Sequence, residues 1–289
     1  MPEISNLPIQ LTDDGSYTFF SPQFGQTFHS SSGAREEAQK KFVNPLDLGS
    51  KSKQQSSLCL LDVCYGLGYN TAAALETIWA VNPNCRVELI ALELEPSVPQ
   101  AAIAHKLINI WSDPIPEILT QLATSKQIQT NQLQANLLIG DARKTIQQIS
   151  HNFQADAIFL DPFSPPSCPQ LWTVEFLSLV ANCLKPDGKV ATYSCSAAVR
   201  TALLAAGLHI GSTPPVGRRS PGTVASFSII KEMPLSQQEQ EHLQTRAAIP
   251  YRDANLCATA KDILLKRKIE QDTCSLEPTA RWKKRWLMA

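Results

Sequence analysis

Short apolar runs alternate with stretches of helical periodicity through the middle of the chain. Apolar runs with few polar residues are typical of strands buried on both faces, and helices between such strands are typical of βαβ units. The pattern predicts an α/β fold with a Rossmann-like, doubly wound, mostly parallel sheet. The expected strands cover residues 58–63, 87–92, 137–139, 157–160, 189–193 and 223–230, and the expected helices cover residues 70–81, 98–108, 143–149, 173–183 and 197–206.

The two ends of the chain do not follow this alternation. Near the start, an Asp-Asp-Gly-Ser turn between two apolar runs predicts a β-hairpin over residues 9–20, and a short helix follows over 33–43. Residues 51–57 are polar and predict a linker, whereas residues 112–134 carry an inserted helix. Two further helices are expected over 236–247 and 258–271. The chain therefore divides into an N-terminal hairpin and cap segment (1–50), a central domain (51–232) and a helical, basic C-terminal extension (233–289).

Composition narrows the functional classes. A hydrophobic content of 43% fills a core, and a net charge of zero excludes a chain that is basic throughout, although basic clusters occur at residues 266–268 and 281–286. No apolar stretch of about eighteen residues and no signal peptide are present, so we expect a cytoplasmic protein without a membrane span. The eight cysteines form no Cys-x-x-Cys pair and the histidines lack metal-ligand spacing, which favours reduced thiols and no metal.

Polar or glycine residues follow three successive predicted strands. Gly66 and Gly68 follow the first strand, where glycine lets the backbone approach a ligand, although a tight strand-to-helix turn also needs glycine. Glu93 ends the second strand, where an acid accepts hydrogen bonds from ribose hydroxyls. After the third strand, Asp141 is placed to accept from an adenine amine and the Ala142 amide to meet a ring nitrogen; an N-cap role for Asp141 is the alternative. Because no phosphate-binding loop is present, a nucleoside sulfonium fits better than a nucleotide polyphosphate.

The segment Leu160-Asp-Pro-Phe-Ser-Pro-Pro166 ends the fourth predicted strand. Asp161 is expected to face the reaction centre, and Phe163 is suited to stack on a planar group. Pro162 and Pro165 would make the rim of this site rigid. The alternative is a plain strand-ending turn, for which Asp-Pro is common.

Taken together, these motifs resemble the methyltransferase domain of the MnmC family, which completes 5-methylaminomethyl-2-thiouridine at the wobble position of certain tRNAs. The resemblance runs from about Ile9 to Phe227. Its most specific stretch is Leu160 to Pro165, followed by Leu171-Trp-Thr173. Other matching motifs are Phe20-Ser-Pro-Gln-Phe-Gly25, His29-Ser30, Gly33-Ala34 with Glu37 and Phe42, Gly66-x-Gly68-x-Asn70, Glu93 with Pro96, Gly140-Asp141, Pro186-x-Gly188, Ala191-Thr-Tyr-Ser194 and Val199-Arg200.

The resemblance implies a class I methyltransferase fold and an N-methylation that uses S-adenosylmethionine. It implies that Asp161 and Phe163 are catalytic, with Pro162, Pro165 and Trp172 near the acceptor. The chain departs from the family pattern at Cys64, where glycine is usual, and at Pro162, where a small residue is usual. The implied donor-binding residues are Gly66, Gly68, Asn70, Glu93, Asp141, Ala142 and Glu37.

The same resemblance implies tRNA as the partner. We expect Arg200, Arg218, Arg219 and the basic tail with Trp282 and Trp286 to contact it; for the tail, a solvated helix end that carries charges is the alternative. Some family members carry a flavin-dependent oxidase domain, but no second dinucleotide fingerprint occurs here, so a stand-alone form without flavin is expected. Other wobble-uridine-modifying enzymes would then supply the aminomethyl substrate. Alternatives are methylation of another nucleic-acid or small-molecule amine, an aminopropyltransferase, and a non-catalytic tRNA-binding member of the fold.

Overall fold

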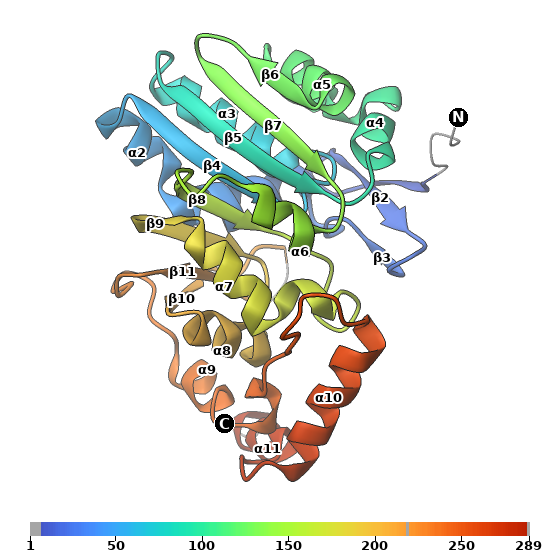
Figure 1. Cartoon of the computed structure of the whole chain (residues 1–289), viewed down its shortest axis with the longest axis vertical. Coiled ribbons are helices and arrows are strands. Elements are labelled where there is room, and N and C mark those ends of the chain that lie inside the picture. Colours follow the sequence, from blue (N-terminus) through green and yellow to red (C-terminus); the bar gives the residue numbers. More distant parts are fainter. Residues whose placement is uncertain (1–6, 218–219, 288–289) are drawn as a thin grey trace.

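An eight-stranded, mostly parallel sheet forms the centre of the molecule (Figure 1). The computed structural model describes residues 7–217 and 220–287. The strand order is β10-β11-β9-β8-β4-β5-β7-β6. Strand β11 pairs antiparallel with both β10 and β9, β6 pairs antiparallel with β7, and the other neighbouring strands are parallel. The strands are β4 (Ser57–Val63), β5 (Arg86–Glu93), β6 (Gln127–Gln129), β7 (Leu133–Ile139), β8 (Ala155–Leu160), β9 (Leu184–Thr192), β10 (His209–Thr213) and β11 (Gly222–Ser226).

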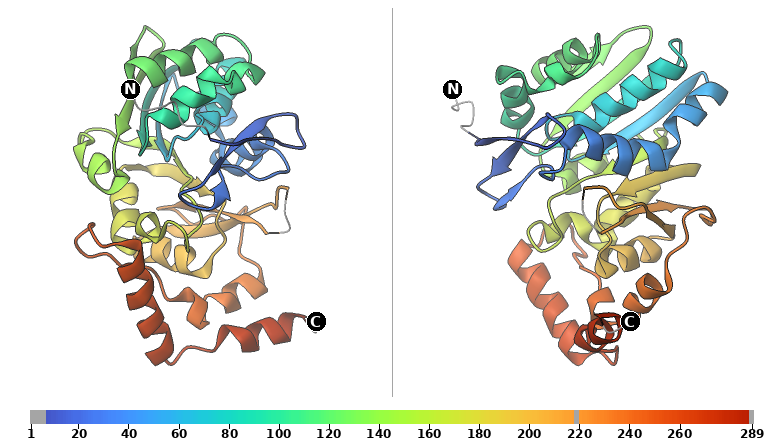
Figure 2. Two further views of the ribbon diagram at one scale, coloured as in Figure 1. Left: turned by 90° about the vertical axis from the view of Figure 1, so that its right-hand side faces the viewer. Right: turned by 180° about the vertical axis from the view of Figure 1, so that it is seen from behind.

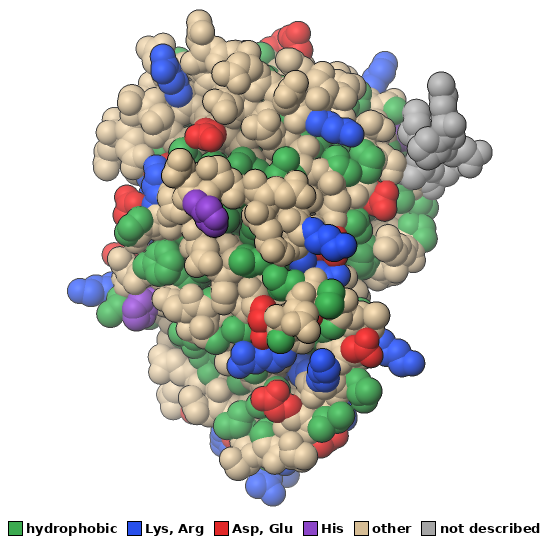
Figure 3. All heavy atoms as spheres, in the orientation of Figure 1, with side chains coloured by type: hydrophobic (Ala, Val, Ile, Leu, Met, Phe, Trp, Pro, Cys, Tyr) green, Lys and Arg blue, Asp and Glu red, His purple; other side chains and the backbone are tan. Residues whose placement is uncertain are grey.

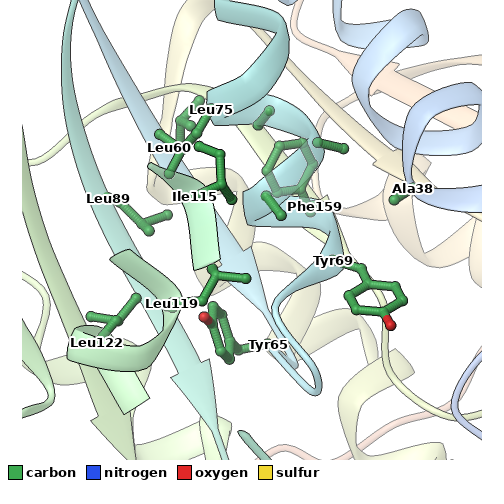
Figure 4. Close-up of a cluster of buried hydrophobic side chains, with 14 of the residues drawn as sticks. Ala38, Leu60, Tyr65, Tyr69, Leu75, Leu89, Ile115, Leu119, Leu122 and Phe159 are labelled. Carbon is green, nitrogen blue, oxygen red and sulfur yellow. The ribbon is translucent and has the colours of Figure 1, made fainter. Parts of the chain in front are cut away.

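Helices cover both faces of the sheet because its strands carry apolar side chains on both sides. On one face, Leu60 and Leu89 pack with side chains of α3 and α5 (Figure 4). On the other face, Leu61 and Val63 pack with α6, α7 and α8. No helix in the described part of the chain is long and apolar enough to cross a membrane. The helices of these layers are α3 (Tyr69–Val81), α4 (Ser97–Ala104), α5 (Ile115–Ser125), α6 (Ala142–Thr145), α7 (Val174–Asn182) and α8 (Ala197–Ala205).

The N-terminal segment lies at the edge where the parallel strands end (Figure 2). Its strands β1 (Ile9–Leu11), β2 (Tyr17–Ser21) and β3 (Gln26–Thr27) form an antiparallel sheet. A helical stretch from α1 (Ala34–Glu37) through a π-helical turn (Ala38–Val43) then packs against α3. This segment therefore forms a second layer over the open edge of the central sheet.

The C-terminal extension packs beneath the α7 and α8 side of the sheet (Figure 1). Its helices are α9 (Gln237–His242), α10 (Ala260–Thr273) and α11 (Thr279–Leu287). Tyr251 and Ile263 are buried in the same core as α7 and α8. The extension is thus joined to the sheet by shared hydrophobic packing.

The predicted α/β architecture is confirmed, but two local predictions are wrong and three elements were not predicted. Residues 48–54, mostly expected as a linker, form the helix α2, because Leu48 and Ser52 are buried where α2 packs on α3. The last predicted strand ends at Ser226 instead of residue 230. The strands β6 and β10 and the helix α11 were not predicted, since short edge strands and a polar helix carry little apolar periodicity.

A buried acid lies at the end of β4. Asp62 has no exposed surface, and only its Oδ2 has a hydrogen-bond partner, the hydroxyl of Thr71 at 2.7 Å. Burial raises the pKa of Asp62 to about 7. The folded protein therefore retains a proton on Asp62 between about pH 4 and about pH 7, where the unfolded chain has released it.

This pKa difference predicts that Asp62 lowers the free energy of unfolding as the pH rises from about 4 to about 7. The Asp62→Asn variant removes the titrating group, so its free energy of unfolding should fall less than that of the parent over this window. Denaturant titrations across the window measure the difference. Asp187→Asn, at an exposed position, is the control and should follow the parent. Parallel pH curves for the parent and Asp62→Asn would contradict this prediction.

Candidate active site

A pocket of about 690 Å³ opens where the parallel strands end, between the central sheet and the N-terminal segment. Its size lies within the range of about 300–1,000 Å³ that is common for small-molecule sites. The order of the chain reverses between β4 and β8, and ligands bind at such a switch point in open α/β sheets. The lining includes Phe24, Phe28, His29, Glu37, Cys64, Gly66, Glu93, Gly140, Asp141, Ala142, Asp161, Pro162, Phe163, Cys168 and Tyr193.

The loop after β4 turns sharply through three residues with positive φ. Cys64, Gly66 and Gly68 have φ values of 71°, 56° and 83°. Gly66 lines the pocket, whereas Gly68 is absent from its lining and begins α3. A Cβ on Gly68 would lie 2.5 Å from the hydroxyl of Tyr65, so only glycine fits this position. Cys64 adopts the left-handed backbone conformation that glycine adopts more readily.

Glu93 connects the ends of β4 and β5. Its carboxylate accepts from the amide of Gly66 at 2.8 Å and from the amide of Glu95 at 2.9 Å. Burial nevertheless raises the pKa of Glu93 above its ordinary value. The carboxylate is thus held by the backbone at the pocket wall, where the sequence places a ribose-binding acid.

Asp141 follows β7 and caps α6 by accepting from the amide of Arg143 at 3.0 Å. The Arg143 guanidinium also binds this carboxylate, with Nη2 2.7 Å from Oδ2. Burial acts to raise the pKa of Asp141, but its bonds to Arg143 outweigh burial and hold the pKa below its ordinary value. The capping role and the pocket position that were alternatives in the sequence are both present.

Asp161 lies at the other end of the pocket, next to two buried charges. It accepts from the Asn70 side chain at 2.9 Å. Burial, together with the negative charge of Glu37, raises the pKa of Asp161 well above its ordinary value. Glu37 is buried and pairs with the buried ammonium of Lys41. Burial acts to raise the pKa of Glu37, but Lys41 and His29 outweigh it and hold that pKa below its ordinary value.

An aromatic wall stands beside Asp161. Phe163 stacks on Phe24 with the ring centroids 4.3 Å apart and makes an edge contact with Phe28 at 4.9 Å. The backbone of this segment is fixed from behind, since Trp172 Nε1 donates to the carbonyl of Phe163 and the Tyr193 hydroxyl donates to that of Pro162, both at 2.8 Å. The wall therefore joins the N-terminal hairpin to the loop after β8.

Known proteins resemble this chain in fold and in sequence. A family model described as S-adenosyl-L-methionine-dependent methyltransferase matches residues 105–228. The crystal structure of MnmC2 from Aquifex aeolicus is 36% identical, with a TM-score of 0.82 over 94% of this chain and 87% of that chain. The chain belongs to the MnmC family of S-adenosyl-L-methionine-dependent methyltransferases. The fold, the family and the methyltransferase class that the sequence indicated are confirmed.

Two further relatives are longer than this chain, which matches only a part of each. An uncharacterized protein of Methanocaldococcus jannaschii is 30% identical over 262 residues, which is 89% of this chain and 70% of that protein. The tRNA 5-methylaminomethyl-2-thiouridine biosynthesis bifunctional protein MnmC of Ralstonia nicotianae is 28% identical over 232 residues, or 75% of this chain. The chain spans about a third (34%) of the length of that bifunctional relative.

Several predicted site residues lie elsewhere than in the pocket. Asn70 is placed behind Asp161 and positions its carboxylate. Trp172 is fully buried and supports Phe163, and Pro165 is buried outside the pocket lining. Neither residue lines the pocket.

The prediction that Arg200 contacts tRNA is wrong. Its side chain is 2% exposed and pairs with Glu239 at 2.7 Å, while it also donates to the hydroxyl of Thr223. A guanidinium satisfied inside the protein is not available to a phosphate. The predicted contacts Arg218 and Arg219 lie outside the described residues.

Sequence reasoning did not single out the pocket residues of the N-terminal hairpin, namely Phe24, Gln26 and Phe28. Phe24 belongs to the motif Phe20 to Gly25 that carried part of the family resemblance, and this was the available signal. The Gln26 amide donates to the hydroxyls of Ser164 at 2.7 Å and Ser167 at 3.0 Å. These contacts join residues far apart in the chain, which local patterns do not reveal.

We predict that Gly68→Ala impairs donor binding through the loop after β4. Alanine in the left-handed region costs about 1–2 kcal/mol, and the added Cβ would also meet the Tyr65 hydroxyl. Gly207→Ala is the matched control, since Gly207 has a similar φ of 87° and open space around it. Denaturant titrations should show a larger decrease in the free energy of unfolding for Gly68→Ala than for Gly207→Ala, and calorimetry should show weaker S-adenosylmethionine binding for Gly68→Ala alone. Equal decreases in stability and in affinity for the two variants would refute this explanation.

Proposed function

We propose that this methyltransferase N-methylates the 5-aminomethyl group of the wobble uridine, or 2-thiouridine, in tRNA. The observation that supports this most directly is the pairing of a carboxylate, Asp161, with the aromatic face of Phe163 in one pocket. A carboxylate suits an amine, and an aromatic ring suits a nucleobase that has left its stack. The bifunctional relatives named for tRNA 5-methylaminomethyl-2-thiouridine biosynthesis match this chain over a part of their length, and they add support.

In this proposal the methyl donor would lie against the wall formed by the ends of β4, β5 and β7. The Glu93 carboxylate would accept from the ribose hydroxyls, Asp141 and the Ala142 amide would bind the adenine edge, and Gly66 would let the backbone approach the donor. All four residues line the pocket. Glu37 is a further proposed contact of S-adenosylmethionine, because it is ionised and also lines the pocket. Bound S-adenosylmethionine would supply an electrophilic methyl group toward Asp161.

Asp161 governs the proton of the acceptor amine. An ammonium has no lone pair, so the amine must be neutral when it attacks. The raised pKa of Asp161 makes its carboxylate a stronger base than an exposed aspartate, which suits it to receive the proton released from nitrogen. Asn70 fixes one carboxylate oxygen of Asp161. Holding the acceptor amine in line with the methyl group contributes about 7–11 kcal/mol in favourable cases.

The surface of the C-terminal extension is proposed to contact the phosphates of tRNA. Lys283 and Lys284 are exposed on α11, whereas Arg285 of the same helix pairs with Glu241 and Glu277. Basic and acidic side chains are interspersed over the lower part of the face in Figure 3, and a basic side chain lies at its lowest point. In this proposal other wobble-uridine-modifying enzymes supply the aminomethyl substrate.

The acceptor is tested with tRNA from cells that lack the gene. We expect nucleoside mass spectrometry to show unmethylated aminomethyl-uridine in this tRNA and its conversion to the methylaminomethyl nucleoside by enzyme and S-adenosylmethionine. Methylation of a different amine, with no change in this nucleoside, would overturn the proposed acceptor and leave the methyltransferase class intact.

Asp161→Asn should separate donor binding from methyl transfer. We expect S-adenosylmethionine affinity in calorimetry to stay within about twofold of the parent, while turnover falls by about 10²–10⁴-fold because the proton acceptor is lost. Parent turnover should rise with pH as Asp161 loses its proton at its raised pKa, and the variant should lack this dependence. Undiminished turnover in Asp161→Asn would remove Asp161 from the mechanism.

A further inference from the structure

Arg143 lies between the pocket and the C-terminal extension. Toward the pocket, its Nε is 3.1 Å from each carboxylate oxygen of Asp141, and its Nη2 is 2.7 Å from Oδ2. Toward the extension, its Nη1 donates to Oδ2 of Asp253 at 2.9 Å and to the carbonyl of Ala258 at 3.0 Å. One guanidinium therefore binds a pocket acid on one edge and the start of the α10 segment on another.

The rigidity of the guanidinium couples these contacts. Its nitrogens lie in one plane, so the group cannot turn toward one partner without changing its angle to the other. Both Arg143 and Asp253 are shielded, with 12% and 2% of their side chains exposed. Shielding from solvent strengthens the charge interaction relative to a surface ion pair. A change in the position of Asp253 would therefore change how Arg143 holds the carboxylate of Asp141.

Asp253 is itself firmly held. Its amide donates to the Glu175 carboxylate at 2.8 Å, and its own carboxylate accepts from the amides of Cys257 and Ala258 at 3.2 Å and 3.1 Å. Two residues earlier, the carbonyl of Tyr251 accepts from the amide at the start of α7 at 3.1 Å. The segment is anchored to the sheet side of the molecule and provides a fixed reference point for Arg143.

We propose that Asp253 is a positioning residue for the donor site, acting through Arg143 to orient the carboxylate of Asp141. The C-terminal extension is then part of the donor-binding structure. This inference rests on the proposed contact between Asp141 and the adenine of S-adenosylmethionine. It assigns a role in donor binding to a segment that the sequence connected with tRNA alone.

Asp253→Asn tests the inference with little disturbance of the loop. Asparagine keeps a side-chain oxygen for the amides of Cys257 and Ala258, but it removes the charge that holds Arg143. We expect the Kd for S-adenosylmethionine in calorimetry to rise about fivefold or more, as for residues that share one ion-pair network. Turnover at saturating donor and KM for the acceptor tRNA should stay unchanged, since Asp161 is not affected.

Asp156→Asn is the matched control. Asp156 is also buried, pairs with Lys185 at 2.7 Å and accepts from the Cys59 amide at 2.8 Å, but it lies near the amino ends of β4 and β8, away from the pocket. Donor affinity equal to the parent in Asp156→Asn, with a loss in Asp253→Asn, supports the proposal. An equal loss in both variants overturns it, because a general loss of structure would then account for the result.

Two further variants separate the inference from the proposed function. Asp141→Asn should weaken donor binding at least as much as Asp253→Asn. If Asp141→Asn binds the donor like the parent, the proposed adenine contact is wrong, and so is the positioning role of Asp253. If Asp141→Asn has a lower donor affinity and Asp253→Asn does not, only the positioning role of Asp253 is overturned. In an Arg143→Ala background Asp253→Asn should cause no additional loss of donor affinity, and an additive loss would also overturn this role.

Discussion

Burial of the parallel sheet on both faces is the constraint on which the rest of the structure depends. Helices cover Leu60 and Leu89 on one side and Leu61 and Val63 on the other, so neither face of these strands is open to a ligand. The carboxyl ends of β4, β5, β7 and β8 meet at one edge, and the chain leaves them in loops that carry their polar residues together. The pocket lies there because this edge is where functional groups remain accessible.

The N-terminal segment turns this open edge into a pocket with distinct ends. The Gln26 amide and the ring of Phe24 bind the loop after β8, and the buried pair Glu37–Lys41 lies alongside Asp161. Burial among these elements, together with the negative charge of Glu37, raises the pKa of Asp161 well above its ordinary value. A carboxylate on an exposed strand end would lack this basicity. The chemistry proposed for Asp161 thus depends on a segment that is remote in sequence.

Paired charges organise the opposite end in a different way. Asp141 remains ionised because Arg143 binds it, and Arg143 in turn is held by the extension. Burying such charges costs desolvation free energy, which hydrogen bonds to the remaining polar atoms help to offset, and each partner here has several. The two ends of the pocket therefore differ in their electrostatics: the pKa of Asp161 is raised, whereas the pKa of Asp141, whose carboxylate pairs with Arg143, is lowered.

The sequence by itself determined the alternation of strands and helices and the residues at strand ends, including Gly66, Glu93, Asp141 and Asp161. These follow from local apolar periodicity and from the rule that parallel strands present their carboxyl ends on one edge. Only the tertiary structure showed that Arg200 and Trp172 are buried, although the sequence predicted that both contact the substrate. It also decided that α2 is a helix, that Phe24 lines the pocket and that Asp253 pairs with Arg143. Such outcomes depend on partners distant in the chain, and periodicity carries no information about which distant residue satisfies a buried charge or covers an apolar side chain.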